Sequence, residues 1–84
     1  MGPIKTNYTI PLGKAHAVRV FLDDRDRPDW LFLHLMREYV AAREVGEGDT
    51  VWAHYLRLGM VMIKRGDMEG LESVLVELVK MSEK

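Results

Sequence analysis

The residues best suited to chemistry in this sequence are its histidines and the acids near them. His34 and Glu38 are four residues apart, which places both side chains on one face of a helix, one turn from each other. His16 and His54 belong to other segments and could join them in the folded chain. Zinc accepts imidazole and carboxylate ligands, but the sequence contains no HExxH signature. Isolated histidines on partly apolar faces are usually structural, and we therefore expect no metal site.

Catalysis would require acids, histidines or a nucleophile that converge in one pocket. The acidic residues are instead concentrated in the charged segment 23–29 and on the exposed face of the last expected helix. There is no cysteine to act as a thiolate, and no glycine-rich phosphate loop. We expect a protein that is not an enzyme and that carries no cofactor.

Composition is typical of one small folded domain spanning residues 1–84, with 48% hydrophobic and 30% charged residues. The net charge of −1 gives no general attraction to nucleic acid or to an anionic membrane. No apolar run approaches the roughly 20 residues of a membrane span, and the first residues lack the apolar core of a signal peptide. We expect a cytoplasmic protein with no membrane partner.

Residues 4–22 allow two interpretations. Apolar and polar residues alternate in 4–10, and Pro11-Leu12-Gly13 suits a three-residue hairpin loop, so that a β-hairpin would cover this segment. The alternative is a short extra helix from Lys14 to Asp23, supported by its alanines and by the spacing of Val18 and Leu22. The β-branched valines and the turn residues favour the hairpin.

Apolar periodicity predicts three helices, at about 29–45, 51–65 and 67–82, so the fold class is mainly α with a three-helix core. A charged break, 23–29, precedes the first of them and places Pro28 in its first turn. Gly46 ends the first helix, Asp49 or Thr50 caps the second, and Gly66-Asp67 separates the second from the third. Gly59, inside the second helix, indicates a close helix crossing.

The first of these helices has more apolar residues than one buried face requires. Its expected buried stripe consists of Phe32, Leu35, Met36, Tyr39 and Ala42. Trp30, Leu31, Leu33 and Val40 lie outside that stripe, and a helix that is apolar on several sides is usually buried on several sides. An 84-residue chain has little further protein to cover them, which favours association with a second copy.

Residues 52–84 resemble one helix pair of the tetratricopeptide family. The resemblance rests on an aromatic and Leu-Gly pattern, a Gly-Asp turn and spaced leucines, namely Tyr55, Leu58, Gly59, Met62, Gly66-Asp67, Leu71, Leu75 and Leu78. Leu71 and Leu78 depart from the family pattern, which has alanine at those points, and the final proline of the repeat is missing. The resemblance implies a scaffold that binds peptides or partner helices.

Together these features predict a small regulatory or adaptor protein that binds another protein or peptide and itself forms a homo-oligomer, most simply a dimer. The expected interface anchors are apolar residues of the first and second of the three core helices, Trp30, Leu31, Leu33 and Trp52. The alternative function is a dimeric DNA-binding regulator of helix-turn-helix type. Its basic residues are scattered among acids, however, and nucleic acid is the less favoured partner.

Overall fold

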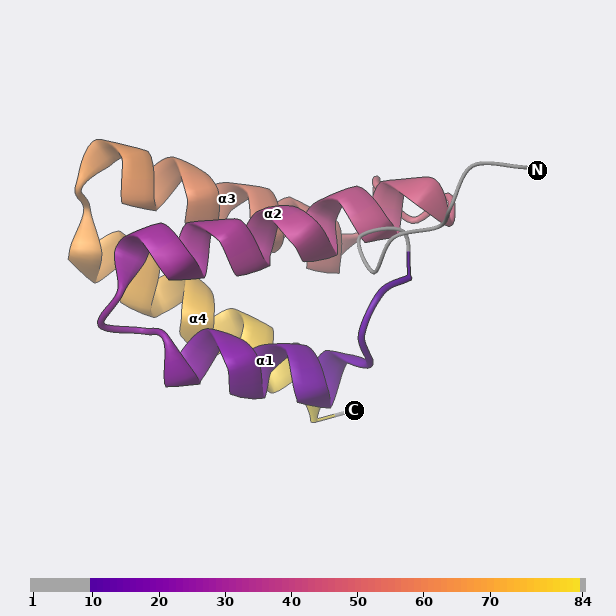
Figure 1. Cartoon of the computed structure of the whole chain (residues 1–84), viewed down its shortest axis with the longest axis horizontal. Helices are drawn as coiled ribbons and strands as arrows, with labels where there is room; N and C mark the ends of the chain where they lie inside the picture. The colour runs from indigo at the N-terminus through magenta and orange to yellow at the C-terminus, as the bar shows by residue number, and fades with distance from the viewer. Residues whose placement is uncertain (1–9, 84) are drawn as a thin grey trace.

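The described part of the chain forms four α-helices that run alternately in opposite directions (Figure 1). A computed structural model describes residues 10–83. Its helices are α1 (Lys14–Asp23), α2 (Pro28–Glu44), α3 (Val51–Arg65) and α4 (Met68–Ser82). Each helix packs against the next, and α4 returns to pack against α1, so the four close into a ring. The arrangement is an antiparallel up-down-up-down helical bundle. The described residues contain no helix long and apolar enough to cross a membrane.

The three predicted core helices are confirmed, and their ends lie where local signals place them. Thr50 Oγ1 accepts a hydrogen bond from the Ala53 N–H at 3.1 Å and caps α3, and Asp67 Oδ1 accepts from the Gly70 N–H at 2.8 Å and caps α4. Gly66 takes the left-handed conformation that ends α3, with φ of 70°, because a side chain there would be strained. These caps satisfy backbone groups that a helix end leaves without partners.

The segment before α2 is a helix and not the favoured hairpin. Residues 4–9, the first expected strand, lie outside the described part of the chain. The second expected strand is wrong, because Lys14–Asp23 forms α1, the alternative interpretation. Helical spacing puts Ala17, Val18 and Phe21 on one buried face, whereas a strand would have turned Phe21 away from Val18. Packing against α4 and α2 outweighs the strand preference of the valines.

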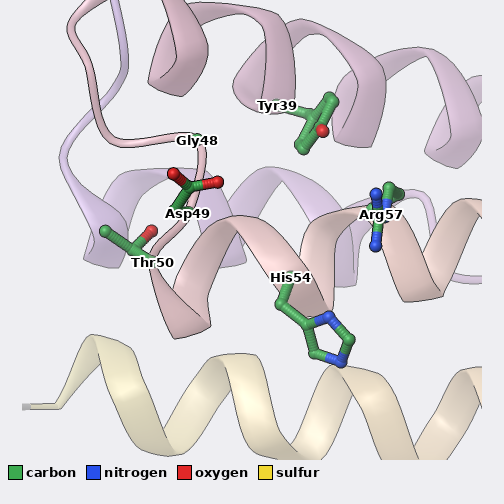
Figure 2. A pocket seen from close by; sticks show the side chains of 6 residues that line it. All are labelled: Tyr39, Gly48, Asp49, Thr50, His54 and Arg57. Atoms are coloured by element: carbon green, nitrogen blue, oxygen red, sulfur yellow. The ribbon is translucent and has the colours of Figure 1, made fainter.

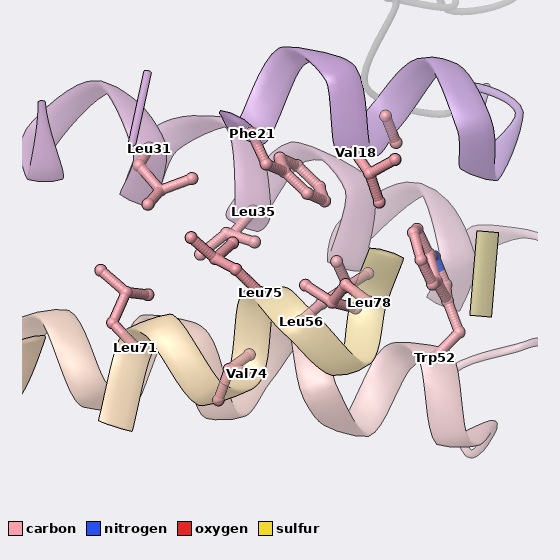
Figure 3. Packing of buried hydrophobic residues seen from close by; sticks show 11 residues of the cluster. Val18, Phe21, Leu31, Leu35, Trp52, Leu56, Leu71, Val74, Leu75 and Leu78 are labelled. Atoms are coloured by element: carbon pink, nitrogen blue, oxygen red, sulfur yellow. The ribbon is translucent and has the colours of Figure 1, made fainter. Parts of the chain in front are cut away.

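The core lies between the four helices, and every helix contributes to it (Figure 3). Phe21 of α1 stacks on Trp52 of α3, with ring centroids 6.4 Å apart. The largest fully buried side chains are Phe21, Leu31, Leu35, Leu56, Leu71 and Leu78. Because α1 supplies Phe21, the three predicted helices alone would not complete this core.

The buried face of α2 differs from the predicted stripe. Its buried residues are Leu31, Leu35, Glu38, Ala41 and Ala42. Phe32 and Tyr39 are only half-buried, and Met36 is exposed. The face is rotated because α2 packs against α1 as well as α3. The unexpected member of the buried face is a charged residue, Glu38.

Candidate functional site

The structure separates the four predicted interface anchors into two pairs. Trp30 and Leu33 are 51% and 43% exposed, so they are available to a partner. Leu31 and Trp52 are only 0% and 7% exposed and belong to the chain's own core. The interface prediction is therefore withdrawn for Leu31 and Trp52. Trp52 of α3 stacks on Phe21 of α1, and Leu31 of α2 belongs to the same buried cluster.

An apolar strip runs along the outward face of α2. Leu33, Met36 and Val40 are spaced three and four residues apart, so they lie on one side of the helix, and each is more than a third exposed. Trp30 forms one edge of this strip, and its ring stacks on the His34 ring with the two centroids 6.5 Å apart. The four residues Trp30, Leu33, Met36 and Val40 are called the α2 strip below. This is the side of α2 opposite its buried residues, Leu31 and Leu35.

Opposite charges stand at the two ends of the α2 strip. Asp29 precedes Met36 by seven residues, and Arg43 follows it by seven. Seven residues are about two helical turns, so both side chains lie near the same face as Met36. Both residues are exposed, and neither makes an ion pair within residues 10–83. The strip is thus an apolar band with an acid at one end and a base at the other.

A polar pocket of about 200 Å³ lies where the α2–α3 loop meets the two helices (Figure 2). It is lined by Tyr39, Gly48, Asp49, Thr50, His54 and Arg57. Two of its groups already have structural roles. The Thr50 hydroxyl caps α3 and donates to the Glu47 carbonyl at 2.8 Å, and the His54 ring packs edge-on against Tyr55 at 5.5 Å. These groups shape the start of α3.

The three histidines do not meet. His34 Nε2 lies 2.8 Å from Asp24 Oδ2, which ties α2 to the α1–α2 loop. His16 and His34 both line a hollow of about 250 Å³ between α1 and α2, while His54 lies in the polar pocket at α3. Among residues 10–83, no three His, Cys, Asp or Glu side chains are grouped so that they could hold a metal ion.

The most unusual side chain is Glu38, which sequence reasoning missed as a buried group. It is 5% exposed. Its Oε2 accepts a hydrogen bond from the Leu12 N–H at 3.2 Å, whereas its buried Oε1 has no hydrogen-bond partner among the described residues. Burial raises the pKa of the Glu38 carboxyl above its usual 4.5, against smaller opposing effects of the Leu12 N–H, Arg37 and His16. The available signal was spacing, since Glu38 follows Leu31 by seven residues and Leu35 by three.

Three of the basic residues are placed by their surroundings. Arg37 lines the hollow at α1 and α2, and Arg57 lines the polar pocket at α3. Lys64 lies over the ring of Phe32, 5.8 Å from its centroid. A DNA-binding surface needs several cations on one face to contact successive phosphates. Of these three cations only Arg57 and Lys64, seven residues apart on α3, share a helix face, and Arg37 belongs to α2.

Comparison of the chain with protein-family models, with curated proteins and with solved structures returned no match.

Proposed function

We propose that the protein is a small non-enzymatic interaction module that pairs with a second copy of itself through the α2 strip. The observation that supports this most directly is the strip itself, four large apolar side chains exposed on one helix face. Contiguous exposed apolar residues commonly mark a protein–protein contact. Burying one large apolar side chain stabilises a complex by about 1.5–3 kcal/mol before the costs of association.

The charges at its ends favour an antiparallel pair of α2 helices. If the two copies cross at Met36, a two-fold axis passes beside that residue, and Asp29 then lies opposite the partner's Arg43. The same contact occurs a second time by symmetry, as in any isologous interface. Leu33 and Val40, on either side of the axis, then face the half-buried rings of Tyr39 and Phe32. Apolar contacts would supply affinity, and the two charge pairs would select the antiparallel orientation.

The size of the strip sets the expected affinity. A helix of 17 residues is about 26 Å long, and its contact with one other helix buries less than the roughly 800 Å² per partner of a standard interface. We therefore expect a dimer with a micromolar dissociation constant.

The test is sedimentation velocity of the full chain over concentrations from about 1 μM to 1 mM, a range that brackets this affinity. The average mass should rise from one chain to two. Leu33→Asp should hold it at one chain, because a carboxylate would have to be buried without a partner. Val76→Asp is the matched control, since Val76 is 48% exposed on α4, and it should leave the association unchanged. A mass of one chain throughout the range contradicts the proposal.

A charge reversal tests the orientation separately. Asp29→Arg and Arg43→Asp should each weaken the dimer, because each places like charges at both ends of the interface. The double variant should restore association, since opposite charges face each other again. The melting temperature of each variant is measured as a control, because Asp29→Arg also removes an acid that stabilises the first turn of α2. A double variant that is weaker than either single variant would exclude this antiparallel arrangement.

A further inference from the structure

The residues that lead into α1 lack the local interactions that fix the starts of α3 and α4. None of residues 10–16 has a buried side chain. The residue before α1 is Gly13, which has no side chain to cap the helix, whereas Thr50 and Asp67 cap α3 and α4. The first residue of α1 is Lys14, a cation at the end where the helix dipole favours an anion. Little energy is therefore needed to unwind the start of α1.

Residues 10–16, called the strap below, are connected to the other helices through a hydrogen bond and a cation–π contact. The Leu12 N–H donates to Glu38 Oε2 at 3.2 Å, and Lys14 Nζ lies 5.5 Å from the centroid of the Trp52 ring. The Leu12 side chain is 42% exposed, so its burial adds only part of the stabilisation that a core leucine gives. The strap is therefore attached to α2 mainly through the carboxyl group of Glu38.

The strength of this attachment depends on whether the Glu38 carboxyl carries a proton. Glu38 is 5% exposed, and its buried Oε1 has no hydrogen-bond partner among the described residues. A buried carboxylate with an unpaired oxygen is much less favourable than a neutral carboxyl group in the same place. When the strap leaves, water can replace the Leu12 N–H at Oε2. Opening of the strap therefore stabilises the ionised carboxylate.

The charged groups around Glu38 offset this effect only in part. Burial raises the pKa of Glu38, and the hydrogen bond from the strap, Arg37 of α2 and His16 of the strap oppose that rise less strongly. His34 lines the same hollow between α1 and α2, where its ring is bonded to Asp24. In the described part of the chain, α3 and α4 contribute no residue to this hollow. The closed strap therefore favours the neutral carboxyl group.

We propose that the strap opens and closes with pH, being closed on α2 while the Glu38 carboxyl is protonated and released once that carboxyl is ionised. Leu12 and His16 line the hollow between α1 and α2, so the hollow widens when the strap opens. Val18 and Phe21 belong to the buried cluster and stay in place, so the bundle remains folded. The ratio of open to closed chains should rise as the pH passes 4.5, the ordinary pKa of this carboxyl. The rise is about tenfold for each unit by which closure raises the pKa of Glu38.

The test is amide hydrogen exchange of the full-length ¹⁵N-labelled protein, measured by NMR from about pH 4 to about pH 8, with each rate divided by that of an unfolded chain at the same pH. The Ala17 N–H reports on the strap, because it bonds to the Gly13 carbonyl at 2.9 Å and is freed when the first turn of α1 unwinds. Leu56, fully buried in α3, reports on unfolding of the whole bundle. Ala17 should be less protected than Leu56 at every pH, and its protection should fall as the pH rises.

Glu38→Gln is the decisive variant. Glutamine keeps the shape of the side chain and an acceptor for the Leu12 N–H, but it does not ionise. The fall in Ala17 protection with pH should disappear, while far-UV circular dichroism remains that of a folded helical protein. Glu44→Gln, at an exposed position of the same helix, should keep the fall.

Three results would each overturn the proposal. The first is a protection of Ala17 equal to that of Leu56 at each pH, which would mean that the strap opens only when the bundle unfolds. The second is a protection of Ala17 that does not change with pH in the unmodified protein. The third is a fall that persists in Glu38→Gln, which would assign the effect to another titrating group, such as His16.

Discussion

At the residue scale, Glu38 is where burial and charge conflict most. Its carboxyl group occupies a position in α2 at which a leucine or alanine would be expected, between Leu35 and Ala42. One of its oxygens holds Leu12, 26 residues away in the chain. The group thus joins the segment leading into α1 to the middle of α2. Desolvation raises the pKa of this carboxyl, and the hydrogen bond from the Leu12 N–H, Arg37 and His16 oppose that rise less strongly.

The raised pKa of Glu38 predicts the sign of a pH dependence. The folded chain retains this proton at pH values where the unfolded chain has released it. The protonated carboxyl of Glu38 therefore contributes fully to the free energy of unfolding below the pKa that this group has in the unfolded chain. The contribution is lost as the pH rises through the pKa that the group has in the folded chain. Each unit by which the pKa is raised corresponds to about 1.4 kcal/mol.

We expect the stability of the protein relative to Glu38→Gln to fall as the pH rises above 4.5, the ordinary pKa of this carboxyl. Urea denaturation at a series of pH values, followed by far-UV circular dichroism, measures the difference. Glu44→Gln, at an exposed site of the same helix, serves as the control. A difference between the protein and Glu38→Gln that is independent of pH would mean that the pKa of Glu38 is not raised.

At the element scale, the close contact at Gly59 determines how α3 meets its neighbours. A Cβ at this position would lie 3.0 Å from Leu35 Cδ1 of α2 and 3.4 Å from Val74 Cγ1 of α4. The glycine thus lets three helices approach at one level, which agrees with the crossing predicted from its place inside a helical pattern. The helix pair α3–α4 forms as expected, while its kinship with the tetratricopeptide family stays a prediction.

Gly59→Ala should destabilise the protein by about 1 kcal/mol. Alanine favours the helix over glycine by about 1 kcal/mol, but an extra methyl group in a packed core costs about 1–3 kcal/mol. Leu35 is fully buried and has little room to move away. Urea denaturation measures the change in stability. The loss caused by Gly59→Ala should be smaller in a protein that also carries Leu35→Val, because the shorter side chain leaves space for the added methyl group. A stabilised Gly59→Ala variant would show that the helices are not in close contact there.

At the scale of the whole molecule, α1 completes the core. It is the shortest helix, with 10 residues, yet it covers parts of both α2 and α4. Phe21, 1% exposed, places its ring against Trp52 across the bundle. Figure 3 shows the Phe21 side chain extending from α1 into the buried cluster to which the other helices contribute.

Phe21→Ala should therefore cost about 3–5 kcal/mol, a large part of the roughly 5–15 kcal/mol that stabilises a typical domain. The neighbouring Leu22 is 40% exposed, and Leu22→Ala should cost much less, within about 1 kcal/mol. Urea denaturation monitored by circular dichroism compares the two. Equal losses for the two variants would mean that α1 does not pack through Phe21.

Local interactions explain which parts of this fold the sequence alone determined. Apolar periodicity placed α2, α3 and α4, and the caps Thr50, Gly66 and Asp67 could be identified because each acts on backbone groups within a few residues. The exposed anchors Trp30 and Leu33 were likewise identified from the excess of apolar residues in α2, although their role as an interface stays a proposal.

Only the tertiary structure decided the conformation of residues 14–22, the rotation of α2, and the burial of Glu38, Leu31 and Trp52. Each depends on contacts between segments far apart in the chain, such as α1 with α4 and Leu12 with Glu38. Segments that contain several valines fit helix and strand patterns almost equally well. Their conformation therefore depends on the surface against which they pack. The same contacts bury the carboxyl group of Glu38, whose burial was not predicted from the sequence.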